Sequence, residues 1–326
     1  MAVLVTGGAG YVGSVVAEEL LKEGYQVVVL DNLQQGHREA VPPGAEFVLS
    51  DICDSSALDE LFAGFSFTTV VHMAAETVVE HSMTNPRLFF QDNVVGGMNL
   101  LEAMIRHDVA QFIFSSSAAV YGEPAAVPVE EGHAKVPVNS YGESKLMFER
   151  ILEWYGKAYG VKHISFRYFN AAGASSRLGE DHRPETHLIP NVLRRVLERS
   201  NRVPIFGMDY PTSDGTCLRD YVHVVDIAKA HLLALSRIEG LNRSIYNLGN
   251  ERPYSVLEVV KTAERITRHE IPTTAHPRRR GDPVVLVASS KLAREELGWK
   301  PEFPELESII ESAWKWMMKH PAGYGR

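Results

Sequence analysis

Residues 2–13 read AVLVTGGAGYVG, an apolar run followed by glycines at positions 7, 10 and 13. The run over residues 2–6 predicts a buried strand, and the apolar residues that follow recur at helical spacing: Val12, Val15, Val16 and Leu20. Glycines at a strand-to-helix junction allow a tight turn and let backbone N–H groups approach a pyrophosphate. The stretch therefore predicts a βαβ unit that binds a dinucleotide, although its glycine spacing departs from the common G-x-G-x-x-G.

The same alternation of strand and helix continues along the chain. Further apolar strands are predicted at residues 26–30, 46–49, 69–72 and 111–114, with a helix at 93–107. This pattern predicts an α/β fold, a doubly wound parallel (Rossmann) sheet. After Tyr168 the chain changes to long loops, so we expect a smaller C-terminal α/β lobe that binds substrate. Residues 1–169 plus about 220–250 are assigned to the nucleotide domain, and the remaining segments of 170–326 to the lobe.

Composition excludes several classes of function. The chain has 326 residues, and no apolar run approaches the length of a membrane span. A formal net charge of −8 disfavours nucleic acid as a partner. No basic, signal-like segment opens the sequence, so we expect a cytoplasmic protein. Cys53 and Cys217 lie far apart, no zinc-like histidine or cysteine spacing is present, and we expect free thiols and no metal.

Asp31 decides which dinucleotide is expected. It ends the second predicted strand, eighteen residues after Gly13, where a carboxylate accepts hydrogen bonds from ribose hydroxyls and repels a 2′-phosphate. Arg38 argues the other way, because an arginine could accept that phosphate, but it stands in a polar loop that we expect to face solvent. NAD is therefore favoured over NADP. The ends of the next two strands would border the adenine and the pyrophosphate: Asp51, Ile52, Ala74 and Ala75.

A second site is predicted at the same sheet edge. The stretch NSYGESK, residues 139–145, places Tyr141 four residues before Lys145, a spacing that occurs by chance in many helices. It gains meaning because the strand at 111–114 runs into Ser115, Ser116 and Ser117 at the carboxyl edge, where ligands bind doubly wound sheets. A phenol has a pKa of about 10, and a nearby ammonium together with a nicotinamide ring would stabilise its phenolate. Lys145 could also bind the nicotinamide ribose.

These motifs resemble a known family. TGGAGYVG, SSS before AAVYG, YGESK and RYFNAAG are similar to the extended short-chain dehydrogenase/reductase family, and DGTCLRDYVHVVD with RRRGDP resembles its UDP-galactose 4-epimerase branch. The resemblance covers residues 2–324. It implies an isomerase in which Tyr141 removes the proton of a sugar 4-hydroxyl, Ser117 hydrogen-bonds that oxygen, and NAD carries the hydride of a transient 4-keto sugar. UDP-galactose and UDP-glucose are the implied substrates.

The resemblance also assigns residues to ligands. It implies cofactor contacts by Gly7, Gly10, Tyr11, Val12, Gly13, Asp31, Asn32, Asp51, Ile52, Ala74, Ala75, Asn93, Tyr141, Lys145 and Tyr168. It implies substrate contacts by Ser117, Tyr141, Asn170, His187, Leu188, Phe206, Arg219, Arg279, Asp282 and Leu286. Among these, the arginines would clamp phosphates, and the residue at 286 helps decide whether an N-acetyl group fits. Two family positions differ, because Ala119 replaces a hydroxyl residue and Thr77 replaces a lysine.

Several alternatives stay open. A 4-epimerase of a UDP-N-acetylhexosamine or of UDP-glucuronate fits the same motifs, and the uronic acid would also need a basic or hydroxyl partner for its C6 carboxylate. A nucleotide-sugar 4,6-dehydratase needs an Asp-Glu pair where this chain has Ala118 and Ala119, and a non-catalytic NAD sensor would not need the intact trio. Relatives usually form homodimers through two helices. The candidate contacts here are Met98, Leu101, Met147 and Ile151, for which a place in the core is an equal alternative.

Overall fold

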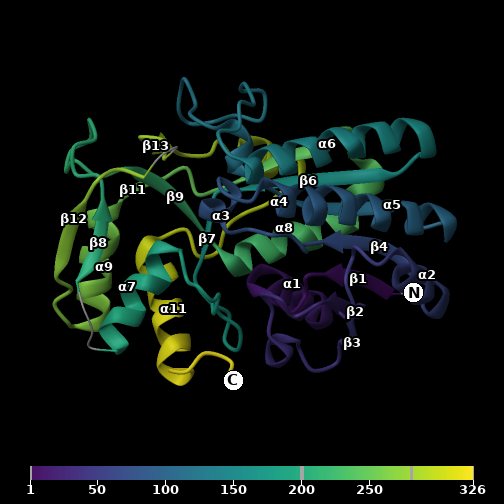
Figure 1. Ribbon diagram of the computed structural model, residues 1–326, viewed down its shortest axis with the longest axis horizontal. Coiled ribbons are helices and arrows are strands. Elements are labelled where there is room, and N and C mark those ends of the chain that lie inside the picture. Colours follow the sequence, from purple (N-terminus) through teal and green to yellow (C-terminus); the bar gives the residue numbers. More distant parts are fainter. Residues whose placement is uncertain (1, 199–201, 280–281, 326) are drawn as a thin grey trace.

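The larger part of the protein is built on one parallel sheet (Figure 1). The computed structural model describes residues 2–198, 202–279 and 282–325. Its main sheet has seven strands in the order β10-β6-β5-β4-β1-β2-β3, and all neighbours are parallel. The strands are β1 (Ala2–Thr6), β2 (Gln26–Asp31), β3 (Glu46–Leu49), β4 (Phe67–His72), β5 (Gln111–Ser117), β6 (Lys162–Tyr168) and β10 (Ile245–Leu248). The predicted doubly wound fold is confirmed.

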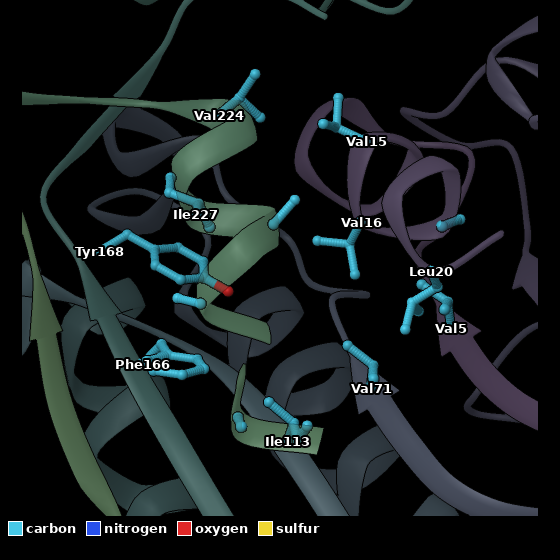
Figure 2. Close-up of a cluster of buried hydrophobic side chains, with 14 of the residues drawn as sticks. Val5, Val15, Val16, Leu20, Val71, Ile113, Phe166, Tyr168, Val224 and Ile227 are labelled. Atoms are coloured by element: carbon cyan, nitrogen blue, oxygen red, sulfur yellow. The ribbon is translucent and has the colours of Figure 1, made fainter. Parts of the chain in front are cut away.

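Helices cover both faces of this sheet. On one face α1 (Tyr11–Lys22) packs against α8 (Val224–Arg237), and Figure 2 shows their side chains meeting those of the strands. Val16, Ile113 and Phe166 of this cluster are fully buried, and each such side chain contributes roughly 1.5–3 kcal/mol. The other face is covered by α2 (Ser55–Gly64), α5 (Gly97–Arg106) and α6 (Ser140–Tyr159).

The residues predicted as dimer contacts lie on α5 and α6. Leu101 is fully buried in the core between the helices and the sheet, which is the second of the two positions that the sequence left open for it. Met98 on α5 is 38% exposed, and Met147 on α6 is 36% exposed. Ile151 is partly buried and packs against the same core.

The smaller lobe stands beside the carboxyl edge of the sheet. It pairs β8 (Val203–Phe206) with β12 (Thr273–His276) and surrounds them with α7 (Leu188–Leu197), α9 (Val256–Thr267) and α11 (Leu306–Lys319). A capping box starts α9, where the Ser255 side chain accepts from the N–H of Glu258 and the Glu258 side chain accepts from the N–H of Ser255. In Figure 1 this lobe lies at the opposite end of the molecule from β3 and α2.

A small second sheet lies between the two parts. Its centre is β9 (Leu218–His223), which pairs with β7 (Asn170–Ala172), β11 (Pro253–Ser255) and β13 (Val285–Leu286). Three short helices complete the fold: α3 (Val79–Ser82), α4 (Pro86–Phe90) and α10 (Lys291–Glu296), the last of which packs on β10. None of the helices in the described ranges is both long and apolar enough to cross a membrane.

Candidate active site

The turn from β1 into α1 forms a cradle that only glycine can build. Gly7 has a φ of 69°, and a Cβ there would lie 2.5 Å from the N atom of Ala74 on the loop after β4. A Cβ on Gly13 would lie 2.2 Å from the carbonyl oxygen of Gly7. Gly10 is the N-cap of α1 and offers no side-chain acceptor to the first-turn N–H groups of the helix. The turn thus presents a helix N-terminus with its donors available to a pyrophosphate, and it fits a dinucleotide.

Asp31 lies beside this cradle at the end of β2. Its carboxylate is 6% exposed and accepts hydrogen bonds from the N–H groups of Ala9 at 3.0 Å and Leu33 at 2.8 Å. Burial raises the pKa of Asp31, and these two bonds act against that rise. Each carboxylate oxygen retains acceptor capacity for a ribose hydroxyl. The guanidinium of Arg38 is exposed and lies 4.4 Å from the ring centroid of Phe47.

The next two strand ends extend the same side of the sheet. The Asn32 amide donates to Asp51 at 2.9 Å, which joins the residues after β2 and β3. Ile52 is buried, and its side chain lies against Gly96, where a Cβ would come within 2.8 Å of it. Ala74 and Ala75 are both partly exposed after β4. These residues therefore share one edge with the glycine turn.

Two residues predicted to contact the cofactor use their polar atoms in hydrogen bonds with other residues of the protein. Asn93 accepts from the N–H of Glu76 at 2.7 Å and donates to Ser144 at 3.0 Å, so it ties the loop after β4 to α6. The hydroxyl of Tyr168 lies 2.8 Å from Nε2 of His231, and its ring belongs to the core shown in Figure 2. Their predicted contacts with a cofactor would have to use other atoms of the two side chains.

Ser117, Tyr141 and Lys145 come together at the carboxyl edge of the sheet. Ser117 ends β5 and its hydroxyl hydrogen-bonds Tyr141, which lies in the first turn of α6. The ammonium of Lys145 lies 5.8 Å from the ring centroid of Tyr141. It donates to the carbonyl oxygen of Ser115 at 2.8 Å and lies 4.9 Å from the ring centroid of Phe114. Helical spacing on α6 and the end of β5 are what bring the three together.

The electrostatics of the trio are set by burial. Burial lowers the pKa of Lys145 to about 7, and the negative charge of Glu149 offsets part of this drop. Burial raises the pKa of Tyr141, and the hydrogen bond from Ser117 offsets part of that rise. The protein alone therefore does not stabilise the phenolate of Tyr141, because the pKa of this tyrosine is raised. Ionising Tyr141 at neutral pH requires further positive charge beside it.

A buried ionic network lies beneath the trio and carries no sequence signature. The Arg167 side chain is 1% exposed, and its guanidinium donates two hydrogen bonds to Glu149, at 2.9 and 2.6 Å. Ser116 donates to Glu149 at 2.5 Å, and Arg167 also donates to the Tyr121 hydroxyl at 2.8 Å. This network fixes α6 against β5 and β6, and so fixes the helix that carries Tyr141 and Lys145.

The predicted substrate residues gather along β9 and the second lobe. Arg219 on β9 has a side chain that is 11% exposed and donates to Asp282 at 2.9 Å. Leu286 on β13 is the register partner of Arg219 and packs against the cluster that contains Ala118 and Leu146, next to the trio. Asn170 on β7 pairs in register with Tyr221, further along β9.

A second group lies at the end of β8. The guanidinium of Arg279 lies 4.1 Å from the ring centroid of Phe206. The preceding Arg278 turns instead to Asp209, at 2.8 Å, while Arg280 of the same run lies outside the described residues. Burial raises the pKa of the Cys217 thiol, and the charges of Arg219, Asp282 and Arg279 also act on it, so both groups lie in the neighbourhood of this residue. Together they offer two guanidinium groups and an aromatic face.

His187 is the N-cap of α7 and Leu188 is its first residue, and their side chains have different surroundings. Leu188 packs against the core of the second lobe. His187 is exposed, and its Nδ1 lies 2.8 Å from Oε1 of Glu185. The structure also brings His187 together with Glu180 and His182, so that potential ligand atoms of the three lie within 4.8 Å of one another. The sequence analysis missed this cluster, because H-x₄-H without cysteine is not a common zinc spacing.

Comparisons with known proteins agree with this geometry. The profile of the NAD dependent epimerase/dehydratase family matches residues 3–249. A relative named UDP-glucose 4-epimerase from Halalkalibacterium halodurans is 48% identical over 99% of this chain and 98% of its own length. The solved UDP-glucose 4-epimerase from Brucella ovis in complex with NAD has a TM-score of 0.93 at 42% identity, covering 96% of this chain and 97% of that one. The enzyme of the same name from Bifidobacterium longum, in complex with NAD+ and UDP, has a TM-score of 0.94 at 35% identity, covering 99% and 100%. The chain belongs to the NAD dependent epimerase/dehydratase family.

Proposed function

We propose that this protein is an isomerase that interconverts UDP-galactose and UDP-glucose at C4 of the sugar, with NAD as its cofactor. The single observation that carries this proposal is the meeting of Ser117, Tyr141 and Lys145 at the sheet edge that also holds the glycine cradle. The names of the relatives, and the NAD and UDP in the solved structures, support the same assignment.

The residues of the first domain are suited to hold NAD. The turn from Gly7 to Gly13 would take the pyrophosphate on the helix N-terminus, and Asp31 would take the adenosine ribose. Lys145 would hydrogen-bond the nicotinamide ribose in addition to the carbonyl of Ser115. When bound, NAD supplies a hydride acceptor that takes hydrogen from C4 and returns it, so no net redox change occurs.

Tyr141 is assigned the role of general base. Its phenolate would take the proton from the sugar 4-hydroxyl, and Ser117, already bonded to the phenol, would hydrogen-bond the same sugar oxygen. Lys145, when protonated, stabilises the phenolate electrostatically from its place against Ser115 and Phe114. Tyr141 would then return the proton to the 4-oxygen as the hydride re-enters at the opposite face of C4, which would complete the epimerisation.

We assign binding of the UDP part of the substrate to the second lobe. Arg219 and Arg279 offer guanidinium forks to the diphosphate, and Phe206 offers an apolar face to the uridine. Asn170, His187 and Leu188 are proposed as further contacts from β7 and α7. A firm hold on the UDP leaves the sugar ring free to turn between hydride removal and return. Leu286, beside the trio, would border the sugar and influence whether N-acetylated or uronic sugars enter.

We also propose that the protein works in the cytoplasm as a homodimer. The half-exposed methionines on α5 and α6, Met98 and Met147, support an interface made by these two helices. Trp154, also on α6, is 68% exposed and lies on a helix that such an interface would cover. Size-exclusion chromatography with light scattering tests this, and a monomeric mass at micromolar concentration would refute it.

The function is tested by incubating the purified protein with UDP-galactose and NAD and measuring UDP-glucose. Tyr141→Phe should lower the rate by about 10²–10⁴-fold, because it removes the general base and leaves the ring packing intact. Tyr159→Phe, at the exposed end of the same helix, is the matched control and should keep the wild-type rate. No conversion by folded, NAD-binding protein would reject UDP-galactose and direct the assay to UDP-glucuronate and UDP-N-acetylglucosamine.

A further inference from the structure

A cluster of histidines and carboxylates occupies the loop that joins β7 to α7. The loop carries the sequence EDHRPETH at residues 180–187. Glu180, His182 and His187 each point a potential ligand atom at a common space, with all three atoms within 4.8 Å of one another. Ligand atoms around one tetrahedral ion lie roughly 3.3 Å apart, so small side-chain rotations would bring these three into coordination.

The carboxylates of this cluster are incompletely satisfied. Glu180 is 6% exposed, and its Oε1 contacts Nδ1 of His182, but its Oε2 is buried with no hydrogen-bond partner among the residues that the structure describes. Oε2 of Glu185 is buried in the same condition. A buried charged oxygen without a partner is costly and rare in native proteins. Pairing each carboxylate with a protonated histidine satisfies only the Oε1 atoms, whereas a cation also accounts for the orphaned oxygen of Glu180.

A small cavity adjoins two of these groups. It has a volume of about 20 Å³, is lined by Glu180 and His187 but not by His182, and its other lining residues are mostly apolar, including Ile189, Pro190 and Met317. That volume is enough for one water molecule. The cavity adjoins the glycine cradle, because Tyr11 is the first residue of α1 and its hydroxyl donates to the carbonyl of Gly173 at 2.6 Å.

The surroundings would hold the ligands in place. Nδ1 of His187 faces Oε1 of Glu185 at 2.8 Å, which fixes the ring tautomer and leaves Nε2 for a metal. Asp181, within the loop, accepts from the N–H of Tyr324 and from Arg183, each at 3.1 Å. The bond from Tyr324 pins the loop to the C-terminal segment at Asp181, between Glu180 and His182.

We propose that Glu180, His182 and His187 bind one divalent transition-metal ion of the zinc class, and that the ion fastens this loop between the cofactor cradle and the second lobe. Two imidazoles and one carboxylate are ligands that suit Zn²⁺, with the fourth position left to water. The ligand set carries one negative charge, so a dication would also neutralise the second buried carboxylate, Glu185. This site goes beyond the proposed epimerase reaction, which needs no metal.

The test uses the full chain without an affinity tag, stripped with EDTA and then supplied with Zn²⁺ or Co²⁺. Wild type should bind one Zn²⁺ per chain by mass spectrometry of metal content, and Co²⁺ should give the visible bands of nitrogen and oxygen ligands. His182→Ala and Glu180→Gln should bind Zn²⁺ at least about tenfold more weakly. His269→Ala, which alters an exposed histidine at the end of α9, should bind like wild type.

Thermal melting provides a second readout that does not depend on catalysis. Zn²⁺ should raise the melting temperature of wild type and His269→Ala and leave that of His182→Ala unchanged. Equal melting temperatures of the metal-free proteins would show that the variants fold. The proposal is overturned if stripped wild type takes up no more Zn²⁺ than His182→Ala. A Co²⁺ spectrum dominated by thiolate bands would also overturn it, because the metal would then sit on Cys53 or Cys217.

Discussion

Replacing Glu149 by glutamine should strongly destabilise the protein. Glu149 and Arg167 have side chains that are 3% and 1% exposed and share two hydrogen bonds of 2.9 and 2.6 Å. Glutamine keeps the shape but removes the charge and turns a donor toward the guanidinium. Breaking a buried pair by removing one partner costs about 3–5 kcal/mol, because the remaining charge is uncompensated. At about 2 °C per kcal/mol for a chain of this size, the melting temperature should fall by roughly 6–10 °C.

Circular dichroism melts of the wild type and four variants measure this effect: Glu149→Gln, Arg167→Met, the two combined, and the control Glu153→Gln. Glu153→Gln removes an exposed carboxylate one turn further along α6 and should shift stability by no more than about 0.5 kcal/mol. The pair Glu149→Gln with Arg167→Met should cost less than the sum of the single changes by more than about 1 kcal/mol, since it leaves no buried charge. A shift for Glu149→Gln as small as that of Glu153→Gln would refute the reasoning.

Three further predictions concern the site. Gly13→Ala should lower NAD affinity by at least about tenfold in a fluorescence titration, since its Cβ would lie 2.2 Å from the Gly7 carbonyl; unchanged affinity would contradict the cradle. Lys145 has a pKa of about 7 when folded and 10.5 when unfolded, so the folded state binds fewer protons between these values. Stability of the NAD-free protein relative to Lys145→Met should therefore rise by about 2 kcal/mol from pH 7 to 9, and a constant difference in urea melts would argue against a neutral buried lysine. Arg219→Met should raise the KM for UDP-galactose by about tenfold or more with little change in kcat, and the reverse pattern in steady-state kinetics would place Arg219 in the chemical step.

Local patterns were enough to predict the nucleotide-binding core. The strand, glycine turn and helix at residues 2–22 follow in order, and burial on both faces makes the parallel strands continuous apolar runs. The small sheet around β9 was not predicted, because its partners β7, β11 and β13 are two or three residues long. Such strands are defined by pairing between distant segments, which a single sequence does not display.

The same contrast holds for the site. Tyr141, Lys145 and Ser117 were predicted because helix spacing and a strand end leave local signals. The network of Glu149 with Arg167 has no such signal, since its members come from a helix and a strand and meet only through packing. The cluster at Glu180 was missed for a related reason, because a loop brings its residues together without a regular period. For Leu101 the sequence left a core position and a dimer contact equally open, because apolar residues on both sides of a helix look alike in sequence.

The most direct test of the proposed chemistry follows the hydrogen at C4. UDP-galactose carrying deuterium at C4 is incubated with the enzyme and NAD in ordinary water, and the UDP-glucose formed is analysed by NMR and mass spectrometry. Removal and return of the same hydride at one site predicts UDP-glucose with deuterium retained at C4 and a slower turnover than with unlabelled substrate. UDP-glucose that has lost the deuterium to solvent would contradict the account, because C4 would then have exchanged by a proton-transfer route that needs no NAD.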